Sequence, residues 1–507
     1  MLSQYSRGAL SGLLAGGLAL GVAELAAGAL GRPVSPAIVV GGAAVDRTPR
    51  FLKEFAIRTF GENDKLVLLS GVFATIALMA ALIGVLAVRR RRAGLVAVAM
   101  LGLVAAGAAA TRPTFRWYDL LPSLLAAVVG VVALARLLGS QGLGADAERE
   151  DAGPGRRGLL VTGGALVLAG LSGVGGRFLL RTRADVEASR RAVVLPRPVQ
   201  PAEALPDGAQ LKLRGLSTFF TPSADFYRVD TALSVPRLTT DEWQLKVHGK
   251  VDRELTLSYD ELLKRPVVER DITLTCVSNE VGGKLLGTAR WLGVELAPLL
   301  RELGVHADAD QLVGTSSDGM TIGTPVSVVL DGRDALLAVA MNGEPLRPEH
   351  GFPVRMVVPG LYGYVSATKW LVDLELSRFD AFDPYWVRRG WAEQAPIKTG
   401  SRIDTPKPLS RTASGTIAVA GVAWAQHRGV QAVEVRVDGG AWQEAELSSA
   451  ASKDLWRQWV WRWDAAPGSH TLQVRATDGT GAVQTQEREE PFPNGASGWH
   501  SIVVTIV

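Results

Sequence analysis

Long apolar stretches fill the first third of this chain, and short segments of alternating apolar and polar residues follow them. Most of the long stretches approach the roughly 20 residues that a helix needs to cross a bilayer. They are Gly8–Gly31, Leu66–Val88, Ala93–Ala110, Leu120–Leu138 and Gly158–Gly176. The pattern predicts an all-α membrane domain of about five transmembrane helices over residues 1–176.

The short segments predict an α+β domain over residues 214–400. Alternation predicts strands at Trp243–Gly249, Asp271–Thr275 and Leu312–Asp318, and Ala335–Met341 is a further apolar stretch. Ser258–Leu263 is typical of a short capped helix, and Trp291–Leu300 is apolar with helical spacing.

The last part of the chain, residues 401–507, predicts an all-β sandwich of immunoglobulin type. Five alternating segments separated by turns carry this prediction: Thr416–Val422, Val430–Val437, Trp456–Trp463, His470–Thr477 and Ser501–Val507. Residues 177–213, between the membrane and α+β domains, are rich in Arg, Pro and Ala and predict an extended linker.

Basic residues beside the apolar stretches predict the membrane orientation. Arg89–Arg92 and the basic residues of 149–157 lie between predicted helices, and their placement in the cytoplasm puts everything after Gly176 outside it. The net charge is only +4, so we expect a membrane protein and no nucleic-acid partner. Arg156-Arg157 before an apolar run resembles a twin-arginine export signal, and an ordinary basic flank explains it equally well.

Cys276 is the only cysteine, and all six histidines follow residue 240. An internal disulfide, a four-cysteine zinc site, an iron–sulfur cluster and a bis-histidine haem within the membrane domain are therefore excluded. Cys276 follows a predicted strand and precedes the polar, glycine-containing stretch Ser278–Gly283. A single thiol can act as a nucleophile, a redox group or one ligand to a soft metal, or can pack as a small apolar side chain.

A second block, Met341–Trp370, suits a bound phosphate. Arg355 and Lys369 supply positive charge, and Ser366–Thr368 supply backbone amides and hydroxyls. Serines at the end of a predicted strand, Ser316 and Ser317, are further candidates for ligand contact or for capping a turn.

Both blocks carry a resemblance to a known family. CVSNEVGG followed by TARWLGVEL, and then HGFPVR with a glycine-rich turn and SATKW, resembles the sulfite oxidase family of molybdopterin-dependent oxidoreductases. The resemblance implies that Cys276 is the molybdenum ligand. FYRVDTALSVP resembles the family's entry segment, and so adds contacts to the molybdenum–molybdopterin cofactor. The candidate cofactor-binding residues are Asp225, Tyr227, Arg228, Cys276, Ser316, Ser317, His350, Arg355, Ser366, Ala367, Thr368 and Lys369.

The chain departs from the family pattern at two places. Arg228-Val229-Asp230 stands where family sulfite oxidases usually have Arg-Asn-His, and Ser278-Asn279-Glu280 stands where many have Asn-Arg-Arg. These departures put sulfite itself in doubt as the substrate. Arg290, Arg388 or Arg389 would have to supply positive charge instead.

We expect a membrane-anchored, extracytoplasmic oxidoreductase that transfers an oxygen atom to or from a small sulfite-, sulfoxide- or N-oxide-like molecule. Electrons would pass to a separate cytochrome or quinone-linked partner. The C-terminal block resembles the family's dimerisation domain, which implies a homodimer. Two alternatives stay open: a non-catalytic receptor or scaffold with a degenerate cofactor fold, and a thiol hydrolase that pairs Cys276 with His350.

Overall fold

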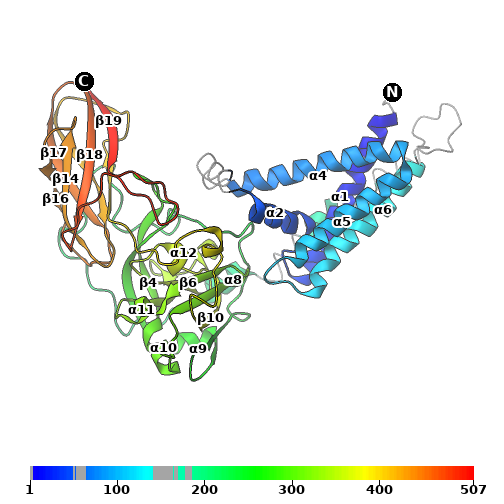
Figure 1. Cartoon of the computed structure of the whole chain (residues 1–507), viewed down its shortest axis with the longest axis horizontal. Helices are drawn as coiled ribbons and strands as arrows, with labels where there is room; N and C mark the ends of the chain where they lie inside the picture. The colour runs from blue at the N-terminus through cyan, green and yellow to red at the C-terminus, as the bar shows by residue number, and fades with distance from the viewer. Residues whose placement is uncertain (1–3, 50–51, 53–63, 141–163, 165–169, 177–184) are drawn as a thin grey trace. The chain divides into compact units, whose positions relative to one another are not determined.

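The computed structural model describes residues 4–49, 52, 64–140, 164, 170–176 and 185–507. The chain forms two units, one of Met1–Asp185 with Ala232–Val235 and the other of Val186–Thr231 with Pro236–Val507. Figure 1 shows the long helices of the first unit in blue and cyan, and the sheets of the second in green to red.

Four of the five predicted apolar stretches form helices in the first unit: α1 (Gln4–Leu30), α4 (Asp64–Arg89), α5 (Arg91–Ala110) and α6 (Leu121–Ser140). Each provides or contributes to a segment long and apolar enough to span a membrane, and the described residues contain four such segments. The fifth stretch lies largely outside the described residues, as does Arg156-Arg157. These helices confirm an apolar helical region.

Glycine allows α1 and α4 to pack backbone against backbone. A Cβ on Gly12 would lie 2.0 Å from Ala80 O, and one on Gly84 would lie 2.1 Å from Gly8 O. A further helix, α2 (Pro36–Arg47), lies between the first two predicted apolar stretches. It starts with Pro36, which suits the first helical position because proline needs no hydrogen-bond acceptor there.

The first part of the second unit contains one mixed sheet, in which β1 and β10 are parallel, and one antiparallel sheet. One has the strand order β2-β1-β10-β5-β6, and the other has β3-β4-β7-β8 with β9 paired to β7. The strands are β1 (Gln244–Gly249), β2 (Leu255–Ser258), β3 (Val267–Thr275), β4 (Leu286–Glu295), β5 (Gln311–Ser316), β6 (Thr321–Pro325), β7 (Leu336–Met341), β8 (Glu344–Pro345), β9 (Arg355–Val357) and β10 (Leu371–Ser377). Short helices connect them: α9 (Tyr259–Leu263), α10 (Leu296–Leu303), α11 (Val326–Leu330) and α12 (Gly363–Ser366).

Most of the predicted strands are present, but the helical interpretation of Trp291–Leu300 is wrong over its first half. Residues up to Glu295 belong to β4, and α10 begins only at Leu296. Nearly every residue of β4 is buried, because the strand pairs with β3 on one side and β7 on the other. A strand buried on both faces shows no alternation, so its sequence looks like that of a buried helix.

Part of the predicted linker also differs from an extended chain. Val186–Ala192 forms helix α8. Arg190 of this helix donates to Glu344 Oε2 at 2.7 Å and to Leu346 O at 3.0 Å. The linker therefore packs against the α+β domain from α8 onward.

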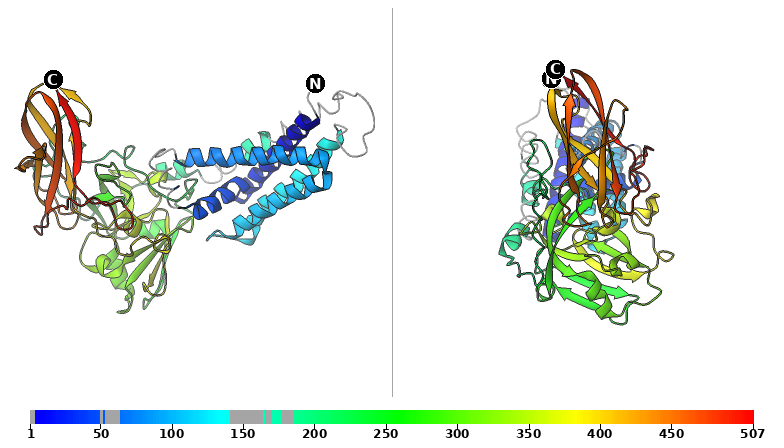
Figure 2. Two further views of the ribbon diagram at one scale, coloured as in Figure 1. Left: turned by 45° about the horizontal axis from the view of Figure 1, so that its top comes forward. Right: turned by 90° about the vertical axis from the view of Figure 1, so that its left-hand side faces the viewer.

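The C-terminal domain is β-rich. One sheet has the order β11-β13-β17-β16 and the other has β12-β19-β18-β14-β15, and Figure 2 shows their strands in orange and red. The strands are β11 (Gly400–Thr405), β12 (Arg411–Thr412), β13 (Gly415–Trp424), β14 (Val430–Val437), β15 (Gln443–Glu444), β16 (Glu446–Leu447), β17 (Arg457–Ala465), β18 (Gly468–Asp478) and β19 (His500–Ile506). Both sheets contribute to one core, which includes Trp459 and Trp463.

Burial of β1 should make a measurable contribution to stability. Val247 of this strand is fully buried, whereas Val194 is 85% exposed. We expect Val247→Ala to lower the unfolding free energy of the detergent-solubilised chain by about 2 kcal/mol, through lost burial and a residual cavity. Val194→Ala makes the same chemical change at an exposed site and should have little effect. Equal urea midpoints for the two variants would contradict the assigned core.

Candidate active site

Cys276 lies at the end of β3, in a loop that the backbone closes on itself. β3 and β4 pair in register up to Thr275 and Leu286, and Cys276 N then donates to Leu285 O at 2.9 Å. Asn279 Oδ1 accepts from Leu285 N at 2.8 Å. The thiol is 7% exposed, and Ser278 N–H points at its sulfur across 3.4 Å. The strand and its closing bonds therefore hold the thiol in one place.

Burial raises the pKa of Cys276, and Ser278 and Lys369 offset part of that rise. Among the described residues, no group of three or more His, Cys, Asp or Glu side chains could hold a metal ion. Cys276 therefore belongs to no such group among the described residues. Most other ligands of a metal bound here would have to come from a cofactor or from solvent.

Two buried cations, Arg355 and Lys369, lie beside one another. Their Cβ atoms would lie 3.1 and 3.0 Å from a Cβ on Gly351, a residue at φ +106° where a side chain would be strained. Burial lowers the pKa of Lys369 to about 8 and that of Arg355 to about 10. Both side chains thus keep a positive charge at neutral pH.

The two cations differ in their partners. Lys369 Nζ donates to Asp230 Oδ2 at 3.0 Å and to Glu349 O at 3.1 Å. Arg355 donates to His350 O at 3.1 Å and lies over the Trp291 ring at 5.2 Å. Arg355 forms no ion pair with a carboxylate of a described residue, so its charge is available to an anion.

The predicted entry segment reaches this cluster through four of its residues. Phe226 packs edge-to-face on His350 with ring centroids 5.9 Å apart, and it stacks on Tyr227 at 5.2 Å. Burial and the neighbouring Cys276 raise the pKa of Tyr227. Arg228 Nε donates to the same Asp230 oxygen that Lys369 binds. Asp225, in contrast, is exposed.

His350 is buried and neutral. Its Nε2 donates to Ser223 O at 2.9 Å, and burial lowers its pKa to about 4. Protonation would place a second N–H in a buried position, which costs free energy when no acceptor is present.

Several buried polar atoms of the predicted site have no hydrogen-bond partner among the described residues. They are His350 Nδ1, Arg355 Nε, Thr368 Oγ1 and Ser316 Oγ. Buried polar atoms are nearly always paired in folded proteins. Four such atoms on predicted residues therefore indicate a ligand that carries both hydrogen-bond donors and acceptors.

Other predicted residues already have partners within the protein. Ser366 Oγ donates to Leu361 O and Tyr362 O at 3.1 Å, and Ala367 N donates to Gly363 O at 3.0 Å. Ser317 N donates to Trp370 O at 2.9 Å. These residues shape the backbone here, and their described bonds leave fewer groups to offer a ligand.

The three arginines considered as alternative sources of positive charge have different surroundings. Arg290 forms two hydrogen bonds with Asp271, at 2.8 and 2.9 Å. Arg388 is exposed in the 3-10 helix Val387–Arg389, and Arg389 stacks on Tyr385 with 3.5 Å to the ring centroid. The charge of Arg290 is therefore already compensated by a carboxylate.

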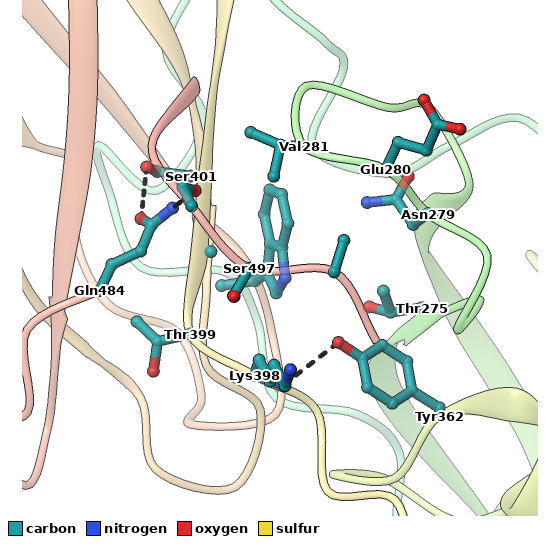
Figure 3. Close-up of a pocket in the computed structure, with 14 residues that line it drawn as sticks. Thr275, Asn279, Glu280, Val281, Tyr362, Lys398, Thr399, Ser401, Gln484 and Ser497 are labelled. Atoms are coloured by element: carbon teal, nitrogen blue, oxygen red, sulfur yellow. Dashed lines mark hydrogen bonds between the residues drawn. The ribbon is translucent and has the colours of Figure 1, made fainter. Parts of the chain in front are cut away.

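A polar pocket beside the Cys276 loop was not anticipated from the sequence. The loop supplies Asn279, Glu280 and Val281, and the C-terminal segments supply Lys398–Ser401, Gln484 and Ser497. Figure 3 shows Tyr362 in its wall, with its hydroxyl 3.4 Å from Lys398 N. No single motif contains these residues. Only the packing of the two domains brings them together.

Cations at this pocket are paired. Lys398 Nζ contacts Glu489 Oε2 at 2.8 Å and Gly495 O at 2.7 Å. Behind Thr399, Arg428 donates to Asp478 at 2.8 Å. The pocket is therefore polar but has little positive charge to offer an anion.

Comparisons with known proteins agree with these features. Residues 232–386 match the oxidoreductase molybdopterin binding domain. The chain is 32% identical over 288 residues to mitochondrial sulfite oxidase of Rattus norvegicus. This match covers 48% of this chain and 52% of that protein. It is 35% identical over 150 residues to the uncharacterized oxidoreductase YuiH of Bacillus subtilis (strain 168), across 30% of this chain and 72% of that protein.

The fold is also seen in a solved structure. The sulfane dehydrogenase SoxCD from Paracoccus pantotrophus matches with a TM-score of 0.51 and 24% identity, over 57% of this chain and 82% of that one. The chain spans about half the length of the mitochondrial relative.

The low pKa of His350 predicts a pH dependence of stability. The unfolded imidazole has a pKa near 6.5 and the folded one near 4, so the unfolded state binds more protons between these values. Stability should fall as pH is lowered from 6.5 towards 4. We expect His350→Gln to reduce this loss by about 2–3 kcal/mol at pH 4. Urea unfolding at pH 7 and pH 4 measures the loss of unfolding free energy. If His350→Gln lost as much stability between these pH values as the wild type, the lowered pKa of His350 would be contradicted.

Proposed function

We propose, because the chain belongs to the sulfite oxidase family of molybdopterin-dependent oxidoreductases, that it catalyses two-electron oxygen-atom transfer on a small substrate. One observation carries the proposal: a single buried thiol at a strand end shares its surroundings with two buried cations and unpaired buried polar atoms. When bound, the molybdenum–molybdopterin group supplies the redox change and the transferable oxygen.

In this proposal Cys276 is the protein ligand to molybdenum. A free buried thiol at this position stays protonated, because burial raises its pKa. Metal binding requires the thiolate, so cofactor insertion releases the thiol proton. The closed loop then serves to keep the sulfur in a fixed orientation.

Arg355 and Lys369 are proposed to bind the cofactor phosphate, and the Thr368 and Ser316 hydroxyls to donate hydrogen bonds to the cofactor. His350 Nδ1, which is an acceptor, is proposed to accept a hydrogen bond from an N–H of the pterin. A phosphate is an anion that offers several acceptors, which suits a buried arginine without a carboxylate partner. We propose the remaining predicted residues as neighbours of the same group: Asp225, Tyr227, Arg228, Ser317, Ser366 and Ala367.

The pocket charges favour a neutral substrate over sulfite. Lys398 and Arg428 are each bound to a carboxylate, and Glu280 adds another acidic side chain to the lining. A dianion would enter without a compensating charge, whereas a sulfoxide or N-oxide needs only hydrogen bonds. Burial raises the pKa of Tyr362 to about 12, so its hydroxyl keeps the proton that it can donate to a substrate oxygen.

The surrounding parts have proposed roles as well. The four apolar helices support membrane anchoring. We propose a multi-pass membrane domain within residues 1–176 and an extracytoplasmic catalytic domain over residues 214–400. We propose that electrons pass to a separate cytochrome or quinone-linked partner. The two sheets of residues 401–507 are proposed to form an immunoglobulin-like sandwich that supports a homodimer.

A thiol hydrolase is the weaker alternative. It requires Cys276 to give its proton to His350, but burial raises the pKa of the thiol and lowers that of the imidazole. Both shifts oppose the transfer. His350 Nε2 is also bonded to Ser223 O.

Metal content tests the proposed ligand. We expect the purified full-length chain to contain stoichiometric molybdenum and Cys276→Ser to lose nearly all of it, because a neutral hydroxyl is a poor ligand compared with a thiolate. Elemental analysis and the fluorescence of the oxidised pterin measure both parts of the group. Ser278→Ala, a change in the same loop that keeps the sulfur, is the control. Full metal retention by Cys276→Ser would reject the ligand.

Substrate comparison tests the charge argument. We expect a higher kcat/KM with a neutral sulfoxide or N-oxide than with sulfite, because the described cations of the pocket are paired. Glu489→Gln frees Lys398 and should raise kcat/KM for sulfite a few-fold, whereas Glu487→Gln, an exposed carboxylate in the same segment, should not. Sulfite as the preferred substrate of the wild-type chain would refute the neutral-substrate proposal.

A further inference from the structure

The loop that presents Cys276 is attached on its outer side to the C-terminal domain. Arg402 Nη1 of β11 donates to Gly283 O at 2.5 Å. The His500 ring of β19 lies against Gly282, where a Cβ would come within 2.4 Å of Nε2 and Cδ2. Gly282 has φ +80°, so the loop needs glycine there both for its backbone and for the imidazole.

The strand that leads into Cys276 is attached to the same domain. Gln426 is fully buried just after β13, and its Nε2 donates to Thr275 Oγ1 at 2.8 Å and to Thr273 O at 3.3 Å. Thr273 N donates to Asp454 O at 3.0 Å, and Trp456 N donates to Thr273 Oγ1 at 2.9 Å. The C-terminal domain thus binds the chain on both sides of the cysteine.

These anchoring side chains are themselves fixed. Arg402 Nε donates to Asp404 at 2.7 Å, and its Nη2 donates to Ser217 Oγ at 3.0 Å. His500 Nδ1 accepts from Ile403 N at 3.0 Å, which leaves the proton of the neutral ring on Nε2. A fixed ring and a fixed guanidinium restrict the loop more than mobile surface side chains would.

We propose that the C-terminal domain is a positioning element of the active site, in which Arg402, His500 and Gln426 hold the Cys276 loop in the conformation that receives the cofactor. The link to the cofactor rests on the proposed function, but the ordering of the loop does not. The domain therefore has a role within each chain, in addition to any role in dimerisation.

The single cysteine provides the test. Full-length protein is purified in detergent from cells grown without molybdate, and alkylation of Cys276 by iodoacetamide is followed by mass spectrometry, relative to the urea-unfolded chain. Gly282→Ala places a methyl group against His500, and Gln426→Leu removes two hydrogen bonds. Each should increase the alkylation rate about five-fold or more, because the loop opens more often.

Gly439→Ala is the matched control. Gly439 has φ +72°, and a Cβ there meets nothing within 4 Å, so this variant carries similar backbone strain far from any contact. Its alkylation rate should equal that of the wild type.

Wild-type alkylation rates in both Gly282→Ala and Gln426→Leu would overturn the proposal. Tryptophan fluorescence identifies a variant that has lost its fold, and Gln426→Leu then decides the question if Gly282→Ala does not fold. Molybdenum retention in molybdate-replete cells is the second measurement, and both variants should retain less metal than Gly439→Ala. If the wild type binds no molybdenum, the proposed function fails, while the alkylation rates still test the positioning of the loop.

Discussion

Buried positive charge is the constraint on which the catalytic domain depends. Arg355 and Lys369 lie inside the protein beside Cys276, and Asp230 is bonded to both Lys369 and Arg228. Burying a cation is costly, and burial lowers the pKa of both residues even though Lys369 is paired with Asp230. An anion such as the phosphate of a cofactor would offset part of this cost at Arg355.

Several polar side-chain atoms around Arg355 and Lys369 have no hydrogen-bond partner among the described residues. β9 and the segment that follows it bring Arg355 and Thr368 together, because Met356 N donates to Thr368 O at 2.8 Å. Ser366 and Ala367 form hydrogen bonds within this turn. In contrast, Thr368 Oγ1, Ser316 Oγ and His350 Nδ1 have no hydrogen-bond partner among the described residues. The fold thus separates groups that maintain the backbone from groups that are left for a ligand.

Between the two domains of the second unit, several cations form ion pairs with carboxylates. Lys398 with Glu489, Arg428 with Asp478 and Arg402 with Asp404 are all ion pairs near the Cys276 loop. Each pair satisfies a cation that would otherwise attract anions. The proposed cofactor region and the pocket lined by Asn279, Glu280 and Lys398 consequently differ in electrostatic character.

The sequence by itself determined the parts of the protein that follow from local pattern. Apolar length predicted four of the described helices, alternation predicted β14 at its observed limits, and Ser258 was recognised as a cap, where its hydroxyl accepts from Glu261 N. The resemblance to the family came from the motifs CVSNEVGG, TARWLGVEL, HGFPVR and SATKW, which contain Cys276, Arg355 and Lys369. These features are encoded by neighbouring residues, so no long-range contact is needed to detect them.

Tertiary structure decided what depends on distant residues. β4 is a strand because β3 and β7 flank it, although its unbroken apolar pattern also suits a helix. The pairing of Lys398 with Glu489 spans 91 residues, and the bond from Arg402 to Gly283 spans 119. Whether a charge is free or compensated, and which domain holds the cysteine loop, depends on such contacts. The local pattern of apolar and polar residues does not predict these long-range contacts, because each partner is an ordinary polar residue in its own segment.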